Sequence, residues 1–119
     1  MINQEEAQKI CDIWTDIIKI GSWKFTVELH DTLISHDSDI KNVTSQFRYN
    51  CQEGIVVLEI TYREATEERI VSMLTDFSLV HELLPRLLES GDQYLDHDDR
   101  NIKPIVAALL KLYRGDKNE

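Results

Sequence analysis

The sequence is short of basic residues, glycine and proline. Its 119 residues hold 13 lysines and arginines against 22 aspartates and glutamates, which gives a formal net charge of −9. Such a chain repels phosphate backbones and anionic lipid, so its composition argues against nucleic-acid and membrane-surface binding and favours a basic protein partner. Four glycines and two prolines exclude a flexible linker or a collagen-like repeat.

The sequence also lacks long apolar runs and a recognisable secretory leader. Its N-terminus, Met-Ile-Asn-Gln-Glu-Glu, is acidic, and no apolar run approaches the roughly 20 residues of a membrane span. Cys11 and Cys51 are therefore expected to be reduced, mostly buried thiols in a cytoplasmic protein. The length predicts a single domain, residues 1–119, around one hydrophobic core.

What the sequence does contain is a change of hydrophobic period along the chain. From Asn3 to Ile20 apolar residues recur at spacings of three and four, which predicts an amphipathic helix with Asn3 as its N-cap. From Trp23 to Leu29 every second residue is apolar, which predicts a half-buried strand. The polar residues from Asp31 to Asn42 predict a long loop.

Two further strands and two helices follow in the pattern. The strands are predicted at Val43–Cys51 and Ile55–Tyr62, joined by a turn at 52–54. The nearly continuous apolar residues of the second predict either that both its faces are covered or that it lies next to the packed helices. A long helix is predicted from Thr66 to about Leu88 and a last one from Arg100 to Tyr113. The order α-β-β-β-α-α predicts an α+β fold with a small, mainly antiparallel three-stranded sheet packed on helices.

One candidate site lies on the long helix. His81 falls on its apolar stripe, where burial favours the neutral, metal-binding imidazole, and Glu82 follows it. Zinc hydrolases place His-Glu-x-x-His on such a helix: the two histidines bind the metal, and the Glu takes a proton from the metal-bound water. Here the fifth position is Pro85, which offers no metal ligand and kinks the helix. A lone histidine on an apolar stripe is also commonly a core residue with both ring nitrogens hydrogen-bonded.

The segment from Phe77 to Leu88, FSLVHELLPRLL, resembles the active-site helix of the small zincin-like domains common in phages and prophages. The order of the other predicted elements is similar as well. The resemblance implies a zincin-like fold in which His81 is the first metal ligand and Glu82 the general base, while Pro85 replaces the second histidine. It leaves the third ligand open, with His97 and the neighbouring aspartates within possible reach. It therefore implies a scaffold that has lost its chemistry.

The acidic linker from Asp92 to Asp99 is the other candidate. Its spacing does not match a calcium loop, which leaves two interpretations: a solvated turn, or a contact surface for a basic protein formed by Asp92, Asp96, Asp98 and Asp99. We predict a non-catalytic interaction or inhibitor protein without a cofactor, encoded by a phage or mobile element. Its acidic surface would mimic phosphate charge toward a nucleic-acid-binding host protein.

The alternative prediction is a metal-dependent hydrolase. It would bind zinc through His81 and an unconventional third ligand such as His97 or Asp98, with Glu82 as the general base.

Overall fold

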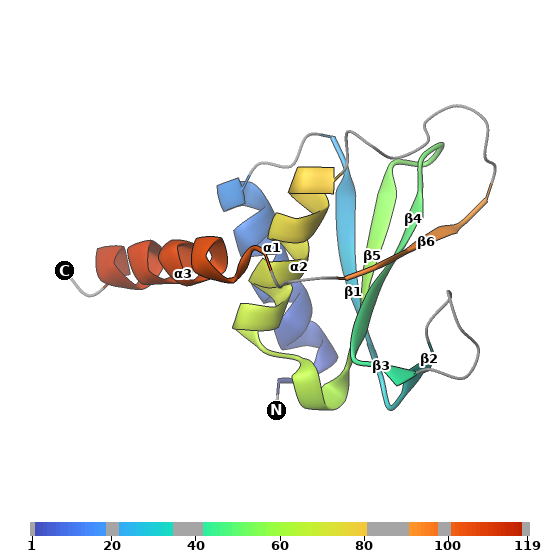
Figure 1. The fold of residues 1–119 in the computed structure, drawn as a ribbon, viewed down its shortest axis with the longest axis horizontal. Helices are drawn as coiled ribbons and strands as arrows, with labels where there is room; N and C mark the ends of the chain where they lie inside the picture. The colour runs from blue at the N-terminus through green and yellow to red at the C-terminus, as the bar shows by residue number, and fades with distance from the viewer. Residues whose placement is uncertain (1, 19–21, 35–41, 81–90, 98–100, 118–119) are drawn as a thin grey trace.

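The chain forms three helices and six strands in the part that the structure describes. A computed structural model describes residues 2–18, 22–34, 42–80, 91–97 and 101–117. The elements are, in order, α1 (Gln4–Ile18), β1 (Lys24–His30), β2 (Leu33–Ile34), β3 (Asn42–Val43), β4 (Ser45–Asn50), β5 (Ile55–Thr61), a 3-10 turn (Tyr62–Glu64), α2 (Glu67–Val80), β6 (Gln93–Asp96) and α3 (Lys103–Lys117). The fold class is α+β, as predicted (Figure 1).

The main sheet has four strands in the order β1-β5-β4-β6, and β2 pairs with β3 in a separate two-stranded sheet. The prediction of three strands was wrong, because β6 adds a fourth; the sheet is mixed, with β4–β5 and β4–β6 antiparallel and β1–β5 parallel. After β1 the chain passes through β2 and β3 and returns to the main sheet as β4. Strand β4 starts at the end of the sheet where β1 finishes, with one strand position left between them. The β4–β5 hairpin then places β5 in the gap, where it runs in the same direction as β1.

Local signals set where the elements begin and end. Asn3 caps α1, since its Oδ1 accepts a hydrogen bond from the backbone N–H of Glu6 at 2.8 Å. Thr66 caps α2 in the same way, through a 3.1 Å bond to its Oγ1 from the N–H of Arg69. The turn between β4 and β5 ends at Gly54, whose φ of 67° lies in the left-handed region that favours glycine.

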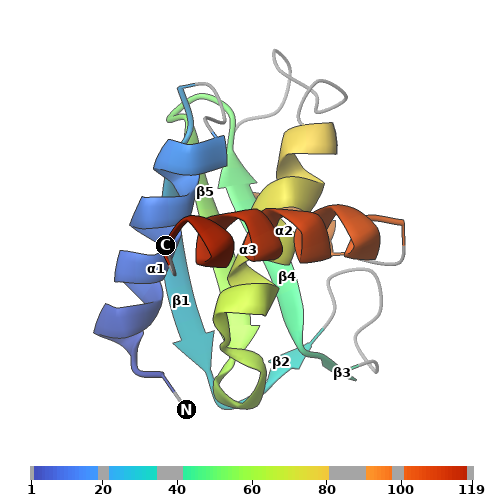
Figure 2. The ribbon, with the colours of Figure 1, turned by 90° about the vertical axis from the view of Figure 1, so that its left-hand side faces the viewer.

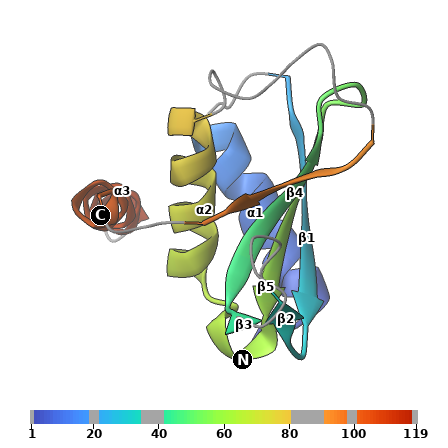
Figure 3. The same cartoon turned by 45° about the vertical axis from the view of Figure 1, so that its right-hand side comes forward.

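In the described part of the chain, the helices lie on one face of the sheet. Helices α1 and α2 lie against it, and α3 packs on the far side of α2 and crosses both helices (Figures 2 and 3). The core lies between the sheet and the two inner helices, with Phe77 of α2 at its centre. The Phe77 ring centroid lies 5.3–5.6 Å from those of Trp23, Phe25 and Phe47. Among the described residues no helix covers the opposite face, which we call the open face of the sheet (Figure 3).

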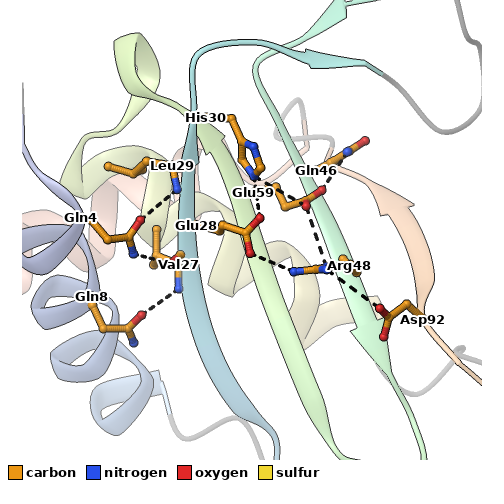
Figure 4. Close-up of polar contacts among 10 residues, drawn as sticks. All are labelled: Gln4, Gln8, Val27, Glu28, Leu29, His30, Gln46, Arg48, Glu59 and Asp92. Carbon is orange, nitrogen blue, oxygen red and sulfur yellow. Dashed lines mark hydrogen bonds and ion pairs between the residues drawn. The ribbon is translucent and has the colours of Figure 1, made fainter.

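Two glutamines of α1 protect the outer edge of β1. Gln4 accepts a hydrogen bond from the N–H of Leu29 at 3.0 Å and donates one to the carbonyl of Val27. Gln8, one turn later, accepts from the N–H of Val27 at 2.8 Å and donates to the carbonyl of Phe25 at 3.3 Å (Figure 4). The two side-chain amides therefore take the place of a neighbouring strand.

Two further expectations need correction, and a third had two interpretations. Part of the predicted linker at 92–99 is strand β6, which forms because it pairs with β4, and the ends of the predicted loop at 31–42 form β2 and β3. Of the two interpretations of the apolar run in β5, the structure agrees with the second: β5 lies between β1 and β4 in the sheet, and in the described part of the chain helices lie against one of its faces (Figure 3). Within the described segments, no helix combines the length and apolar character that a membrane crossing requires.

Candidate functional site

The motif predicted on the long helix falls beyond the part of α2 that the structure describes. That part ends at Val80, so His81, Glu82 and Pro85 lie outside the described residues, as do Asp98 and Asp99. Of the other predicted site residues, Asp92 precedes β6, Asp96 is its last residue, and His97 follows it. The structure therefore places His97 and the start of the acidic segment.

His97 connects the end of β6 to two side chains of α2. Its Nε2 atom lies 3.0 Å from Oγ of Ser72, and its Nδ1 atom lies 2.8 Å from Oδ2 of Asp76. Ser72 and Asp76 are four residues apart, so they leave the same face of the helix. The His97 side chain is 1% exposed, and the ring of Phe47 packs at right angles to it, with 5.8 Å between centroids.

The proton positions of this Ser72–His97–Asp76 relay follow from donor chemistry. A carboxylate only accepts, so Nδ1 of His97 donates to Asp76, and Nε2 accepts the Ser72 hydroxyl proton when the imidazole is neutral. The order serine, histidine, acid is that of serine hydrolases. Ser72 lies in the wall of a cavity of about 300 Å³ between α2 and α3, but it is only 4% exposed. With Ser72 almost completely buried and both ring nitrogens of His97 within 3.0 Å of α2 side chains, the relay links β6 to α2.

Ser72 and Asp76 are not among the site residues predicted from the sequence. The available signal was a polar pair at positions i and i+4 on an otherwise apolar stretch of helix, in which Ile70, Val71, Met73 and Leu74 are all fully buried. Such a pair needs a polar partner when it is buried. The sequence pattern does not show that β6 pairs with β4, and this pairing places His97 beside Ser72 and Asp76.

A second polar cluster lies on the open face of the sheet (Figure 4). It consists of Glu28 and His30 on β1, Arg48 on β4 and Glu59 on β5. Nε2 of His30 lies 2.8 Å from Oε1 of Glu28 and 3.7 Å from Oε2 of Glu59. Nη2 of Arg48 lies 2.9 Å from Oε2 of Glu28, while its Nε lies 3.8 Å from Oε2 of Glu59.

The two carboxylates of this cluster are direct neighbours across the sheet. Glu28 and Glu59 are register partners in the parallel β1–β5 pair, and Glu59 is almost completely buried. Their oxygens approach within 4.8 Å, where two full charges repel by roughly 3 kcal/mol at an effective dielectric constant of about 20. Arg48 offsets this repulsion, and Nε2 of Gln46 donates a 2.9 Å hydrogen bond to Oε1 of Glu59.

Hydrogen bonding in the open-face cluster is incomplete. Three shielded atoms have no hydrogen-bond partner of acceptable geometry within the described ranges: Nε2 of His30, Oε1 of Gln46 and Nε of Arg48. Burying such atoms without a partner costs free energy, so the cluster is not arranged for stability alone.

The solvent-facing side of α1 combines acids with exposed isoleucines. Ile13 is 47% exposed and Ile17 is 41% exposed, although a typical amphipathic helix buries its large apolar residues. Four exposed acids flank them on the same helix: Glu5, Glu6, Asp12 and Asp16. Lys9 is the only basic residue of α1, and its Nζ lies 4.0 Å from Glu5.

Together these features define an α+β protein with helices on one face of a mixed sheet and a charged cluster on the other. Comparison with known protein families, curated proteins and solved structures gives no match to this chain. The function proposed below therefore rests on the chain's own residues.

Proposed function

We propose that this chain is a non-catalytic interaction protein that binds a protein with a basic surface. The observation that carries the proposal is the mixed acidic and apolar face of α1, formed by Glu5, Glu6, Asp12, Ile13, Asp16 and Ile17, which we call the α1 face. The net charge of −9 also supports a basic partner, because a strongly acidic chain attracts positively charged proteins over long range.

Helical spacing gives the α1 face two parallel stripes. Ile13 and Ile17 are four residues apart and share one stripe, while Asp12 and Asp16 share the adjacent one. An amphipathic segment that alternates apolar and basic side chains at helical spacing matches both stripes at once. Acidic rim charges accelerate the encounter, and the isoleucines supply apolar area that is removed from water on binding.

The acidic segment before and after β6 is the weaker candidate for this contact. Asp92 lies 3.9 Å from the charged guanidinium of Arg48 and 3.5 Å from the side-chain amide of Asn50, so part of its charge is neutralised within the fold. Asp12 of the α1 face accepts a 2.9 Å hydrogen bond from Gln8, which is a neutral donor and leaves its charge in place. The finer features of the proposal are a phage or mobile-element origin and a nucleic-acid-binding host protein as the partner. They rest on the net charge and on the resemblance to zincin-like domains.

The position of the relay supports a zincin-like scaffold that has lost its metal. In the zincin arrangement, two side chains at i and i+4 on the helix after the sheet converge with a third ligand from a later segment. In this chain Ser72 and Asp76 have that spacing on α2, and they converge on His97. Because a serine hydroxyl stands in this convergence, we propose that the relay is structural, while the former metal position stays at His81, as the resemblance implies.

The metal-dependent hydrolase is the second candidate and has less support. It requires His97 or Asp98 as a ligand, and both ring nitrogens of His97 already take part in the relay. Metal analysis of chelator-free protein tests it. Stoichiometric zinc that disappears in His81→Ala would favour the hydrolase over the binding protein.

The α1 face can be tested with a defined basic probe. A synthetic amphipathic peptide with leucine and lysine at helical spacing is titrated by fluorescence anisotropy at several salt concentrations. We expect binding that weakens steeply with salt, and Asp12→Asn/Asp16→Asn should reduce affinity by about 5- to 10-fold at low salt. Ile13→Ser should weaken binding while the salt dependence stays the same.

Two controls make the outcome decisive. Glu53→Gln removes an exposed acid in the β4–β5 turn and should leave peptide affinity unchanged. A second peptide with serine in place of leucine should bind more weakly, because it lacks the apolar stripe. The proposal would be contradicted if the peptide affinity did not change with salt. It would also be contradicted if the Asp12→Asn/Asp16→Asn variant bound the peptide as tightly as Glu53→Gln.

A further inference from the structure

We propose that the open face of the sheet carries a binding site for a divalent metal ion of the zinc class, with Glu28, His30 and Glu59 as ligands. One nitrogen of His30 and one oxygen from each glutamate all lie within 4.8 Å of one another. The site is separate from the relay, which is on the helix-covered face, and does not depend on the proposed binding function.

The backbone fixes the three ligands. Glu28 and His30 are two residues apart on β1, so both side chains point to the same face of the sheet. Glu59 on β5 is the register partner of Glu28. A tetrahedral zinc ion with ligands at about 2.0–2.1 Å separates neighbouring ligand atoms by roughly 3.3 Å. The observed separations from Nε2 of His30, 2.8 Å to Glu28 and 3.7 Å to Glu59, lie on either side of this value.

The donor set fits this class of ion. One imidazole and two carboxylates are ligands that zinc and neighbouring transition metals accept, and three protein ligands leave a fourth position for water. Nε2 of His30 makes no hydrogen bond of acceptable geometry within the described ranges, although Oε1 of Glu28 lies 2.8 Å away, and it can act as the ligand atom when the imidazole carries its proton on Nδ1. Gln46 holds Oε1 of Glu59, which leaves Oε2 directed toward His30, as an outer hydrogen bond orients a ligand in metal sites.

Arg48 acts as the competing cation. Its guanidinium occupies the space beside both glutamates, at 2.9 Å from Glu28 and 3.8 Å from Glu59. A metal ion takes over the same neutralising role, so the guanidinium must move away as the ion binds. Asp92 lies 3.9 Å from Nη1 on the other side of Arg48 and provides a carboxylate to receive it (Figure 4).

Zinc titration by isothermal calorimetry tests the site on the full chain after chelator treatment and dialysis. Wild type should bind one zinc ion, and His30→Ala and Glu59→Gln should each weaken binding by at least about 100-fold, as expected for loss of a direct ligand. Arg48→Gln should strengthen binding by about 10-fold because the competing charge is gone. The matched control Glu53→Gln should bind zinc like wild type.

A spectroscopic readout separates this site from any other. In ¹⁵N-resolved NMR the Nε2 signal of His30 should shift on zinc addition while the His97 signals stay in place. Circular dichroism confirms that each variant is folded. The proposal would be overturned if His30→Ala bound zinc as tightly as wild type. If, in addition, His81→Ala abolished zinc binding, the result would favour the hydrolase. Neither result depends on peptide binding at the α1 face.

Discussion

Replacing His97 by alanine should destabilise the fold more than any other single change in the relay. The substitution removes a hydrogen bond to the Asp76 carboxylate, worth about 1.5–3 kcal/mol, and one to the Ser72 hydroxyl, worth about 1 kcal/mol. It also removes one donor from a largely buried carboxylate and the ring that packs on Phe47. Together these losses amount to about 3–5 kcal/mol of unfolding free energy.

Urea unfolding followed by tryptophan fluorescence measures this effect, because the chain has two tryptophans. Ser72→Ala should cost only about 1 kcal/mol, and the Ser72→Ala/His97→Ala double variant should cost about 1 kcal/mol less than the sum of the single changes. Since His97 ties β6 to α2, hydrogen exchange should speed up at β6 in His97→Ala before it does at β5.

Lys111→Ala, at an exposed position of α3, is the matched control and should change the unfolding free energy by less than about 0.5 kcal/mol. A His97→Ala variant within 1 kcal/mol of wild type, or strictly additive Ser72 and His97 effects, would refute the structural role of the relay. His97→Gln keeps one hydrogen-bonding amide and should recover part of the loss, which distinguishes lost hydrogen bonds from lost ring packing.

Three further predictions concern the core, the sheet edge and a buried thiol. Phe77→Ala should cost about 3–5 kcal/mol in urea unfolding, because the ring is fully buried at the centre of the aromatic cluster. Gln4→Ala/Gln8→Ala removes the side-chain bonds that cover the β1 edge, so it should lower stability by about 2–3 kcal/mol and promote self-association, measured by size-exclusion chromatography with light scattering. Burial, with a smaller contribution from the Asp12 charge, raises the pKa of the Cys11 thiol from 9.0 to about 12. Above pH 9 the thiol of the unfolded chain therefore loses its proton while the thiol of the folded chain keeps it. The unfolding free energy should fall by up to about 1.4 kcal/mol per pH unit between pH 9 and pH 12, measured by urea unfolding. Cys11→Ala should reduce this slope.

The elements that the sequence predicted are those with several periods of their own pattern. Helix α1 shows four turns of apolar spacing with an N-cap at Asn3, and β1 alternates over seven residues, so local chemistry alone determines both. Strand β6 has only four residues and lies among aspartates. Its strand conformation comes from pairing with β4, which is a long-range contact that no local pattern contains.

The parallel pairing of β1 with β5 was beyond the sequence for a related reason. Turn signals at Gly54 predict that β4 and β5 form a hairpin, and the chain order then suggests that β1 pairs next to β4. In the structure the β2–β3 excursion separates β1 from β4 by one strand position, and β5 fills the gap. The neighbours Glu28 and Glu59 follow from this topology, so the open-face cluster could not be derived from residue spacing alone.

The two polar clusters differ in a way that separates structural from functional residues. In the relay, the two ring nitrogens of His97 are both hydrogen-bonded in a buried position, as expected where a polar group serves stability. On the open face, two carboxylates oppose each other in register, and Nε2 of His30 and Nε of Arg48 have no hydrogen-bond partner of acceptable geometry in the described part of the chain. Valine or threonine at position 59 would fit a central strand without this repulsion. Unpaired polar atoms and opposed like charges are found mainly at functional sites. A ligand that pairs these atoms and neutralises these charges therefore gains more free energy on the open face than at the relay.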